Sequence, residues 1–326
     1  MDTRPTTRVW RALLFAGVAV VVFVASLALT SRITYRGWSL LAYLTDHLVE
    51  PGGPYQSLRR FREAEEIAET VDAVDVVVFG SSHAYRGFDP RIFSEAQLRL
   101  VNLGSTNQTP LNSRYLVERY VPKLRPKLVL FEVYYATLAG DGFEASRDLV
   151  INTPWTWEMQ RMAFATRHLG AIQLTMAKGL GLTADESDAV QRDIDGERYV
   201  PGGYCEAGGP RRSLVPREPF SVEVLPRQLD YLVDATAIAR EHGAKVVWVT
   251  HPFPRDHREA LLNYDEVHAD IDQTAEEAKV PYWNFDGALE LDPLAHFADF
   301  HHLDAEGVRI FDEAVIVELR NHGYVE

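Results

Sequence analysis

The sequence contains a single cysteine, Cys205, among 326 residues. One thiol cannot form a disulfide within the chain, and it excludes a metal site built from several cysteines. Positive charge is also in short supply, because the formal net charge is −14. This balance argues against nucleic acid as a partner and against polybasic binding to a membrane surface. The remaining composition, with 46% apolar and 25% charged residues, is typical of a globular protein.

Charge is also missing from Ala12 to Thr30, and this stretch is long enough to cross a bilayer as a helix. More arginines precede the stretch than follow it, which favours a tail inside the cell and a body outside. We therefore predict that residues 1–31 form a cytoplasmic tail and a single-pass anchor in the membrane. The alternatives are a signal peptide cleaved after Ser26-Leu27-Ala28 and a buried helix of a soluble protein.

The next segment, residues 32–70, reads as a connection between the anchor and the body. Ile33 to Glu50 carries aromatic and leucine residues at helical spacing, which indicates a juxtamembrane helix with its aromatics at the interface. Pro51-Gly52-Gly53-Pro54 then breaks the chain and indicates a linker. A helix with a charged outer face is expected from Arg59 to Val71.

Strand and helix patterns alternate over most of residues 71–326, which predicts one α/β domain with a central parallel sheet between helices. The rhythm breaks at about residues 136–227, where glycine and proline are frequent. We predict an inserted cap over the active face there, partly helical from Met159 to Leu180, because a structureless loop of that length is unusual. Trp155, Trp157 and Tyr134 are expected to line an open groove. The predicted strands are 76–79, 98–103, 127–135, 245–250 and 281–285, and the predicted helices are 109–123, 228–242, 264–278 and 305–321.

Two serines and a histidine follow the first predicted strand of this domain. The apolar run from Val74 to Phe79 ends at Gly80, and Ser81, Ser82 and His83 come next. Open α/β sheets place their chemistry at the carboxyl ends of parallel strands. A serine there becomes a nucleophile only when a general base lies beside it. Taken alone, a Gly-Ser-Ser turn is a common structural feature of α/β folds.

A candidate base lies near the end of the chain, in Asp299-Phe300-His301-His302-Leu303-Asp304. An aspartate three residues before His302 can hold one imidazole nitrogen while the other faces a serine hydroxyl. The alternative is a metal site, for which His296, Asp299, His301, His302 and Asp304 are candidates, with His251 as a further ligand. No His-x-x-x-His pair or second ligand cluster supports that alternative.

The segments FGSSHAYRGFDP and DFHHLD resemble the first and last blocks of the SGNH/GDSL hydrolase superfamily. The resemblance implies a flavodoxin-like three-layer sandwich with no metal and no cofactor. It implies that Ser82 is the nucleophile, that His302 is the general base and that Asp299 orients His302. It also implies that the amides of Ser82 and Gly104 form an oxyanion hole.

The chain departs from this family's pattern in its third block, Gly-x-Asn-Asp, whose asparagine supplies an oxyanion donor. No asparagine follows the third strand, which ends Phe131-Glu132-Val133-Tyr134-Tyr135. We expect Asn107 to replace it, since loss of one such donor typically costs on the order of 100- to 1000-fold in rate. The residues expected to support the site are Ser81, His83, Glu132 and His301.

Within this superfamily, the chain is most similar to the membrane-anchored branch that acts in O-acylation of the cell envelope. That branch includes proteins of alginate acetylation and of teichoic-acid D-alanylation. The resemblance implies serine-dependent transfer of an acyl group to or from an envelope glycan, outside the cytoplasm. It also implies a membrane-bound acyltransferase partner that delivers the acyl group. A plain carbohydrate esterase is the alternative among enzymes, and a catalytically degenerate scaffold protein is the alternative from another class.

Overall fold

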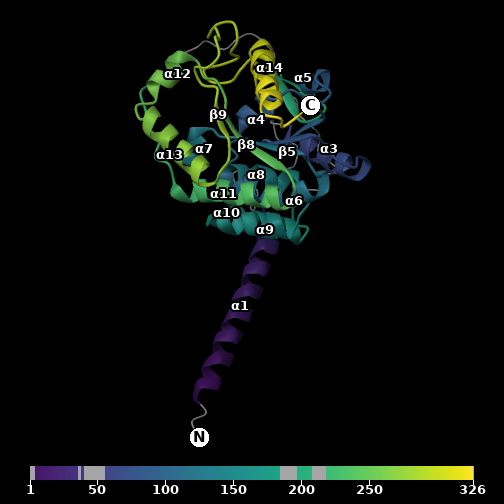
Figure 1. Ribbon diagram of the computed structural model, residues 1–326. Coiled ribbons are helices and arrows are strands. Elements are labelled where there is room, and N and C mark those ends of the chain that lie inside the picture. The colour runs from purple at the N-terminus through teal and green to yellow at the C-terminus, as the bar shows by residue number, and fades with distance from the viewer. Residues whose placement is uncertain (1–3, 36–37, 40–55, 184–196, 208–217, 326) are drawn as a thin grey trace.

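The computed structural model describes residues 4–35, 38–39, 56–183, 197–207 and 218–325. Its centre is a five-stranded sheet in the order β4-β3-β5-β8-β9, with every neighbouring pair parallel (Figure 1). Each strand lies within a segment that the sequence predicts. Most strands end before the predicted segment does. The predicted α/β class and central parallel sheet are therefore confirmed. The strands are β3 (Val76–Phe79), β4 (Leu100–Asn102), β5 (Leu128–Glu132), β8 (Lys245–Thr250) and β9 (Tyr282–Asn284).

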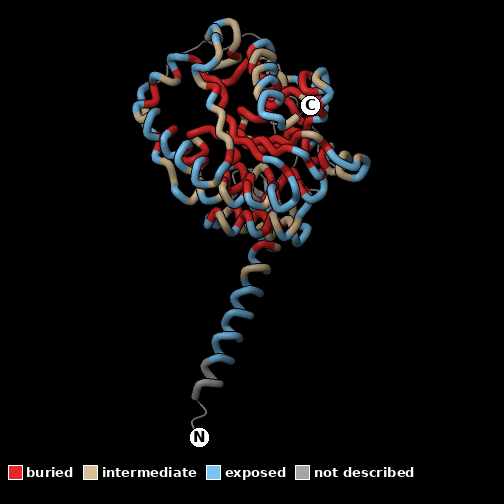
Figure 2. Tube along the Cα trace, in the orientation of Figure 1, coloured by how far each residue is buried: buried red, intermediate tan, exposed pale blue. Residues whose placement is uncertain are grey.

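Successive residues of the strands pack into two separate hydrophobic cores, one on each face of the sheet. In β3, Val77 and Phe79 belong to one core, and Val76 and Val78 belong to the other. A strand buried on both faces reads as a continuous apolar run, as VVVF does. Figure 2 shows the buried strands between the two layers of helices. The first face carries α3 (Ser57–Thr70), α6 (Pro110–Leu124), α11 (Pro226–Glu241) and α13 (Tyr264–Glu277), and the second carries α4 (Ser82–Gly87), α5 (Pro90–Glu95) and α14 (Ala305–Asn321).

The insertion is present, but its described helices α8, α9 and α10 do not cover the carboxyl edge of the sheet as predicted. α9 packs against α6, and α8 packs against α3, so these helices add an outer layer to the first face. The reason is their apolar content, because Leu149, Met159 and Leu174 join the core on that face. Parts of the insertion, residues 184–196 and 208–217, lie outside the described residues. The described elements are α7 (Tyr135–Leu138), α8 (Phe143–Asn152), α9 (Trp157–Ala165), α10 (Leu169–Gly179), β6 (Glu197–Val200) and β7 (Tyr204–Ala207).

The predicted groove of Trp155, Trp157 and Tyr134 is wrong. The two tryptophan rings contact each other, and Trp155 packs on Gly179 at the end of α10. Tyr134 instead contacts the rings of His83 and His301 at the carboxyl edge of the sheet. Among the described parts of the insertion, α7 follows β5 at that edge, Phe220 contacts His257 there, and the β6–β7 hairpin approaches it because β7 packs against α4.

The N-terminal helix α1 (Arg4–Arg32) extends away from the body (Figure 1). Its segment Val9–Arg32 is long and apolar enough to cross a membrane, and a signal sequence would meet the same criteria. The predicted juxtamembrane helix is wrong at its start. There β1 (Thr34–Tyr35) and β2 (Trp38–Ser39) form an antiparallel pair, in keeping with the strand preference of threonine and aromatic residues. The rest of that prediction, residues 40–50, lies outside the described residues.

Candidate active site

Gly80, Ser81 and Ser82 form a turn, here called the serine turn, where β3 passes into α4 at the carboxyl edge of the sheet. Gly80 is required there, since a Cβ atom would lie 2.6 Å from Cβ and Oε2 of Glu132 at the end of β5. Ser81 caps α4, because its Oγ accepts a hydrogen bond from the amide of His83 at 3.2 Å. Ser82 follows as the first residue of α4 and is half-buried. The local sequence therefore leaves the hydroxyl of Ser82, and not that of Ser81, facing the edge of the sheet.

The structure brings Ser82, His302 and Asp299 into one chain of hydrogen bonds. His302 Nε2 lies 2.8 Å from Ser82 Oγ, and His302 Nδ1 lies 2.8 Å from Asp299 Oδ2. The second carboxylate oxygen of Asp299 accepts the amides of His301 and His302 at 3.0 and 2.8 Å. These contacts fix the carboxylate against its own loop, and the carboxylate in turn fixes the imidazole. The geometry is that of an activated serine with a base and an orienting acid.

The surroundings of this chain set the charges of its members. Burial lowers the pKa of His302, and its hydrogen bond to Asp299 only partly offsets this effect. For Asp299, burial favours the neutral acid. The hydrogen bond from His302, together with the charge that His302 carries once it is protonated at low pH, outweighs burial and holds the pKa of Asp299 well below its usual value. At neutral pH, His302 is therefore an uncharged base beside an ionised Asp299. A general base must be in this state to accept the proton of a hydroxyl.

Arg86 and Glu197 flank the pair of Asp299 and His302, and sequence reasoning missed both. Arg86 Nη1 lies 3.3 Å from His302 Nδ1 and 3.9 Å from Asp299 Oδ2, while its other arm pairs with Glu197 of β6. The sequence could have indicated Arg86, because Arg86 is four residues after Ser82 and lies on the same face of α4. Glu197 gave none, since only the fold of the insertion brings it near.

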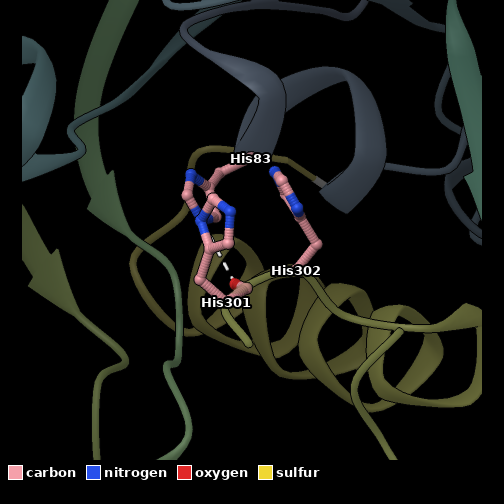
Figure 3. Close-up of side chains that lie close together, drawn as sticks. All are labelled: His83, His301 and His302. Carbon is pink, nitrogen blue, oxygen red and sulfur yellow. Dashed lines mark hydrogen bonds between the residues drawn. The ribbon is translucent and has the colours of Figure 1, made fainter. Parts of the chain in front are cut away.

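His83 and His301 form a second pair of imidazoles beside His302, as Figure 3 shows. His83 Nε2 lies 3.1 Å from the carbonyl oxygen of His301 and 3.2 Å from its Nδ1. Burial, together with the charges of neighbouring imidazoles, lowers the pKa of both rings. A hydrogen bond from the N–H of one neutral ring to the unprotonated nitrogen of the other explains this contact without a metal. Their hydrogen bonds position the 301–302 loop against α4.

The metal alternative needs ligands that the structure does not gather. His296 Nδ1 accepts the amide of Asp292, and Asp304 caps α14, so neither belongs to the cluster around His302. Within the described part of the chain, the group able to hold an ion is His83, His301 and His302, whose ligand nitrogens lie within 4.8 Å of one another. Both nitrogens of His302 already contact Ser82 and Asp299. A metal there would therefore compete with the hydrogen-bonded chain.

Of the two predicted oxyanion donors outside the serine turn, both have other partners. The amide of Gly104 donates to Asn102 Oδ1 at 3.1 Å, and Asn107 Nδ2 donates to Glu144 Oε2 at 2.7 Å. The prediction placed both groups at the oxyanion. These contacts use the single hydrogen of the Gly104 amide and one of the two hydrogens of Asn107 Nδ2. A glycine is needed at position 104 for another reason, because α4 approaches it closely. For the amide of Ser82, the structure shows no such competing acceptor among the described residues.

We expect Gly104→Ala to displace the serine turn. A Cβ atom there would lie 2.8 Å from Ala84 Cβ and 2.9 Å from both the Ser81 carbonyl oxygen and the Tyr85 amide nitrogen. Such overpacking against backbone typically costs about 1–3 kcal/mol of stability. Chemical unfolding should show this loss, together with slower reaction at Ser82. Gly17→Ala, with no atom within 4 Å, is the control. Equal stability of both variants would contradict the close approach.

Glu132 supports the serine turn from beneath. Its Oε2 accepts hydrogen bonds from the amide of Ser81 at 2.7 Å and from Ser81 Oγ at 2.8 Å. Burial raises the pKa of Glu132 to about 7, although the two bonds from Ser81 oppose this shift. A strand-end carboxyl group is therefore a structural part of the turn that carries Ser82.

This raised pKa predicts a pH-dependent stability that Glu132→Gln removes. Because the folded pKa lies above the ordinary 4.5, the folded state binds the proton more tightly, and stability falls as pH rises from about 4.5 to about 7. The loss amounts to about 3 kcal/mol for a shift of this size. Glutamine keeps an acceptor for Ser81 and cannot ionise, so its unfolding free energy should lack this decline.

The measurement is denaturant unfolding across that pH range for the wild type and Glu132→Gln. Glu290→Gln, at an exposed position, controls for the loss of a carboxylate as such. If the wild type and Glu132→Gln change in parallel with pH, Glu132 does not titrate in this window.

Comparison with other proteins gives similarity at the level of solved structures only. No protein-family model matches the sequence, and no curated protein does. The chain is similar to a GDSL-like lipase from Bacteroides thetaiotaomicron, with 14% identity, a TM-score of 0.43, and coverage of 82% of this chain and 99% of that one. It is also similar to a catalytic mutant of an acetylxylan esterase from Geobacillus stearothermophilus, with 12% identity, a TM-score of 0.43, and coverage of 78% and 98%.

A lipase/acylhydrolase from Enterococcus faecalis is similar at 11% identity, with a TM-score of 0.41 and coverage of 76% of this chain and 96% of that one. These identities and TM-scores carry no inference about activity. The geometry around Ser82 is therefore the basis for assigning a function.

Proposed function

We propose that the chain is a serine enzyme that cleaves acyl esters through an acyl-enzyme at Ser82. The observation that carries this proposal is the continuous chain from Ser82 Oγ through His302 to Asp299, with both links at 2.8 Å. A degenerate scaffold has no need to keep an uncharged imidazole in hydrogen-bond contact with a half-buried serine. The complete chain therefore favours an enzyme over a scaffold.

The reaction follows from these contacts. Ser82 Oγ attacks the acyl carbon as His302 Nε2 takes its proton, and the ionised Asp299 stabilises the imidazolium formed. The amide of Ser82 donates to the oxyanion. His302 then gives its proton to the leaving oxygen, which departs and leaves the acyl group on Ser82. An acceptor hydroxyl gives its proton to His302 and attacks the acyl group, so that Ser82 regains its proton from His302.

We further propose that the acceptor is a hydroxyl of a cell-envelope glycan and that the site lies outside the cytoplasm. One feature supports this finer proposal: the apolar helix α1 would keep the body at a membrane, where envelope glycans are assembled. The other partners of Gly104 and Asn107 leave few donors for the oxyanion, which slows acyl transfer to water and to a glycan alike. A membrane-bound acyltransferase would deliver the acyl group to Ser82.

The experiment is covalent labelling of the full chain in detergent with a fluorophosphonate, followed by mapping of the labelled peptide. The expected result is a label on Ser82 that is lost in Ser82→Ala and in His302→Ala. A folded wild type that takes up no label would overturn the proposal.

Acyl transfer is tested separately from cleavage. The chain is incubated with an activated acetyl ester, with and without an acetyl-free oligosaccharide, and the products are identified by mass spectrometry. Acetylated oligosaccharide formed faster than acetate supports transfer. Acetate alone identifies a plain esterase, and it leaves the role of Ser82 intact.

A further inference from the structure

Exposed apolar side chains gather on α9, α10 and the residues next to them. Trp157 is 69% exposed and Leu169 is 62% exposed. Elsewhere in the described part of the body, such side chains are scattered over separate elements. An apolar group of this kind on one face indicates a contact surface. We define the α9–α10 surface by its large exposed side chains, which are Trp155, Trp157, Phe164, Leu169 and Leu180.

The charge of this surface differs from that of the whole chain. Residues 153–183 contain one acidic residue, Glu158, against Arg161, Arg167 and Lys178, although the chain carries a net charge of −14. Glu158 is half-buried, Arg161 pairs with Glu118 of α6, and Arg167 is exposed. Within residues 153–183, exposed tryptophan and an exposed arginine without an exposed carboxylate suit the interface of a bilayer, where tryptophan is enriched and anionic headgroups attract cations.

The end of α1 meets the body beside this surface. Leu27 is buried in the core of the first face, Phe23 packs against that core, and α1 contacts α10. In Figure 1, α9 and α10 form the base of the body next to α1, and in Figure 2 the exposed helix becomes buried there. The helix and the surface therefore share one end of the molecule.

The length of α1 then places the body against the lipid. From Val9, where the apolar segment begins, to Ser26 there are 18 residues before Leu27, the first residue of α1 that is buried in the body. At 1.5 Å per residue they span about 27 Å, close to the ~30 Å hydrocarbon core. In a membrane-spanning α1, Leu27 therefore lies near the membrane interface. The body surface that touches Leu27 lies at the same depth.

We propose that the α9–α10 surface docks on the lipid bilayer, so that the body is held against the membrane and does not hang from a free tether. Trp155 and Trp157 lie at the headgroups, and Phe164 and Leu169 contact the acyl chains. The surface fixes one orientation of the body, with α14 at the end away from the bilayer.

The test uses the full chain reconstituted into phosphatidylcholine vesicles. Cys205 is buried, so an introduced cysteine can be labelled selectively with an environment-sensitive fluorophore. The labelled variants are Phe164→Cys, Leu169→Cys, Val18→Cys in α1 and Val317→Cys on α14, which is 52% exposed. Lipids with a nitroxide on the acyl chain should quench the labels at 164, 169 and 18, and should leave the label at 317 bright.

Two results would overturn the proposal. Quenching at 18 without quenching at 164 and 169 shows a spanning α1 whose neighbouring surface stays in water, as expected if that surface binds a protein partner. A bright label at 18 shows that α1 does not cross the bilayer, and the body is then not held against the membrane. Neither result bears on fluorophosphonate labelling of Ser82, so this proposal and the proposed function fail separately.

Discussion

Ser82→Ala is expected to lower the rate of acyl-ester cleavage by roughly 10⁴- to 10⁶-fold, and His302→Ala should lower it by a similar factor. The two side chains act as one unit, because the hydroxyl is a nucleophile only while His302 Nε2, 2.8 Å away, takes its proton. The double variant should therefore be no slower than either single variant. Cleavage of an activated ester by the three variants measures this directly.

Ser94→Ala is the matched control, since Ser94 lies exposed on α5. It should react as the wild type does, and all variants should give the same circular dichroism spectrum. A double variant slower than both single variants by the product of their effects would show that Ser82 and His302 act independently. The chain of hydrogen bonds would then not be the reacting unit.

Asp299→Asn should lower the rate by about 10⁴-fold with little change in structure. The asparagine oxygen can still accept the amides of His301 and His302, so the loop keeps its form. Its amide group, however, donates to His302 Nδ1, where the carboxylate accepts. The proton of the neutral imidazole then moves to Nε2, which faces Ser82 and can no longer accept a proton from it.

The rate of fluorophosphonate labelling measures this effect. Asp304→Asn is the control, because Asp304 caps α14 by accepting the amides of Glu306 and Gly307. This control should label at nearly the wild-type rate while losing some stability. Rapid labelling of Asp299→Asn would mean that the carboxylate does not set the tautomer of His302.

Much of this site could be predicted from the sequence because its signals are local. The run VVVF before Gly80 indicates a strand buried on both faces, and the strand end positions Ser82. The spacing of Asp299 and His302 allows their contact within one loop. The prediction of the sheet succeeded for the same reason, since its strands are short apolar runs between turn signals.

The predictions that failed depend on contacts between distant segments. Packing of apolar faces places α9 against α6 and Trp155 against Gly179. Sequence periodicity shows that a helix has an apolar face, but it does not show which other face that one packs against. The sequence indicated that Gly104 has a role in the site. The reason that a glycine is needed there, the close approach of α4, is visible only in three dimensions. Glu197 reaches Arg86 from the insertion, whose sequence has little periodicity.

The separation of Ser82 from His302 also has a consequence for the order in which activity arises. The two residues lie 220 positions apart, and Asp299 and His302 come just before the final helix, α14. Contacts of such high sequence separation form late, because the closure of a long loop must precede them. In a chain truncated before residue 299, Ser82 would lack both His302 and Asp299, and α4 would also lose its packing against α14. The proposed acyl-enzyme chemistry therefore depends on a segment that joins the site only after this long loop has closed.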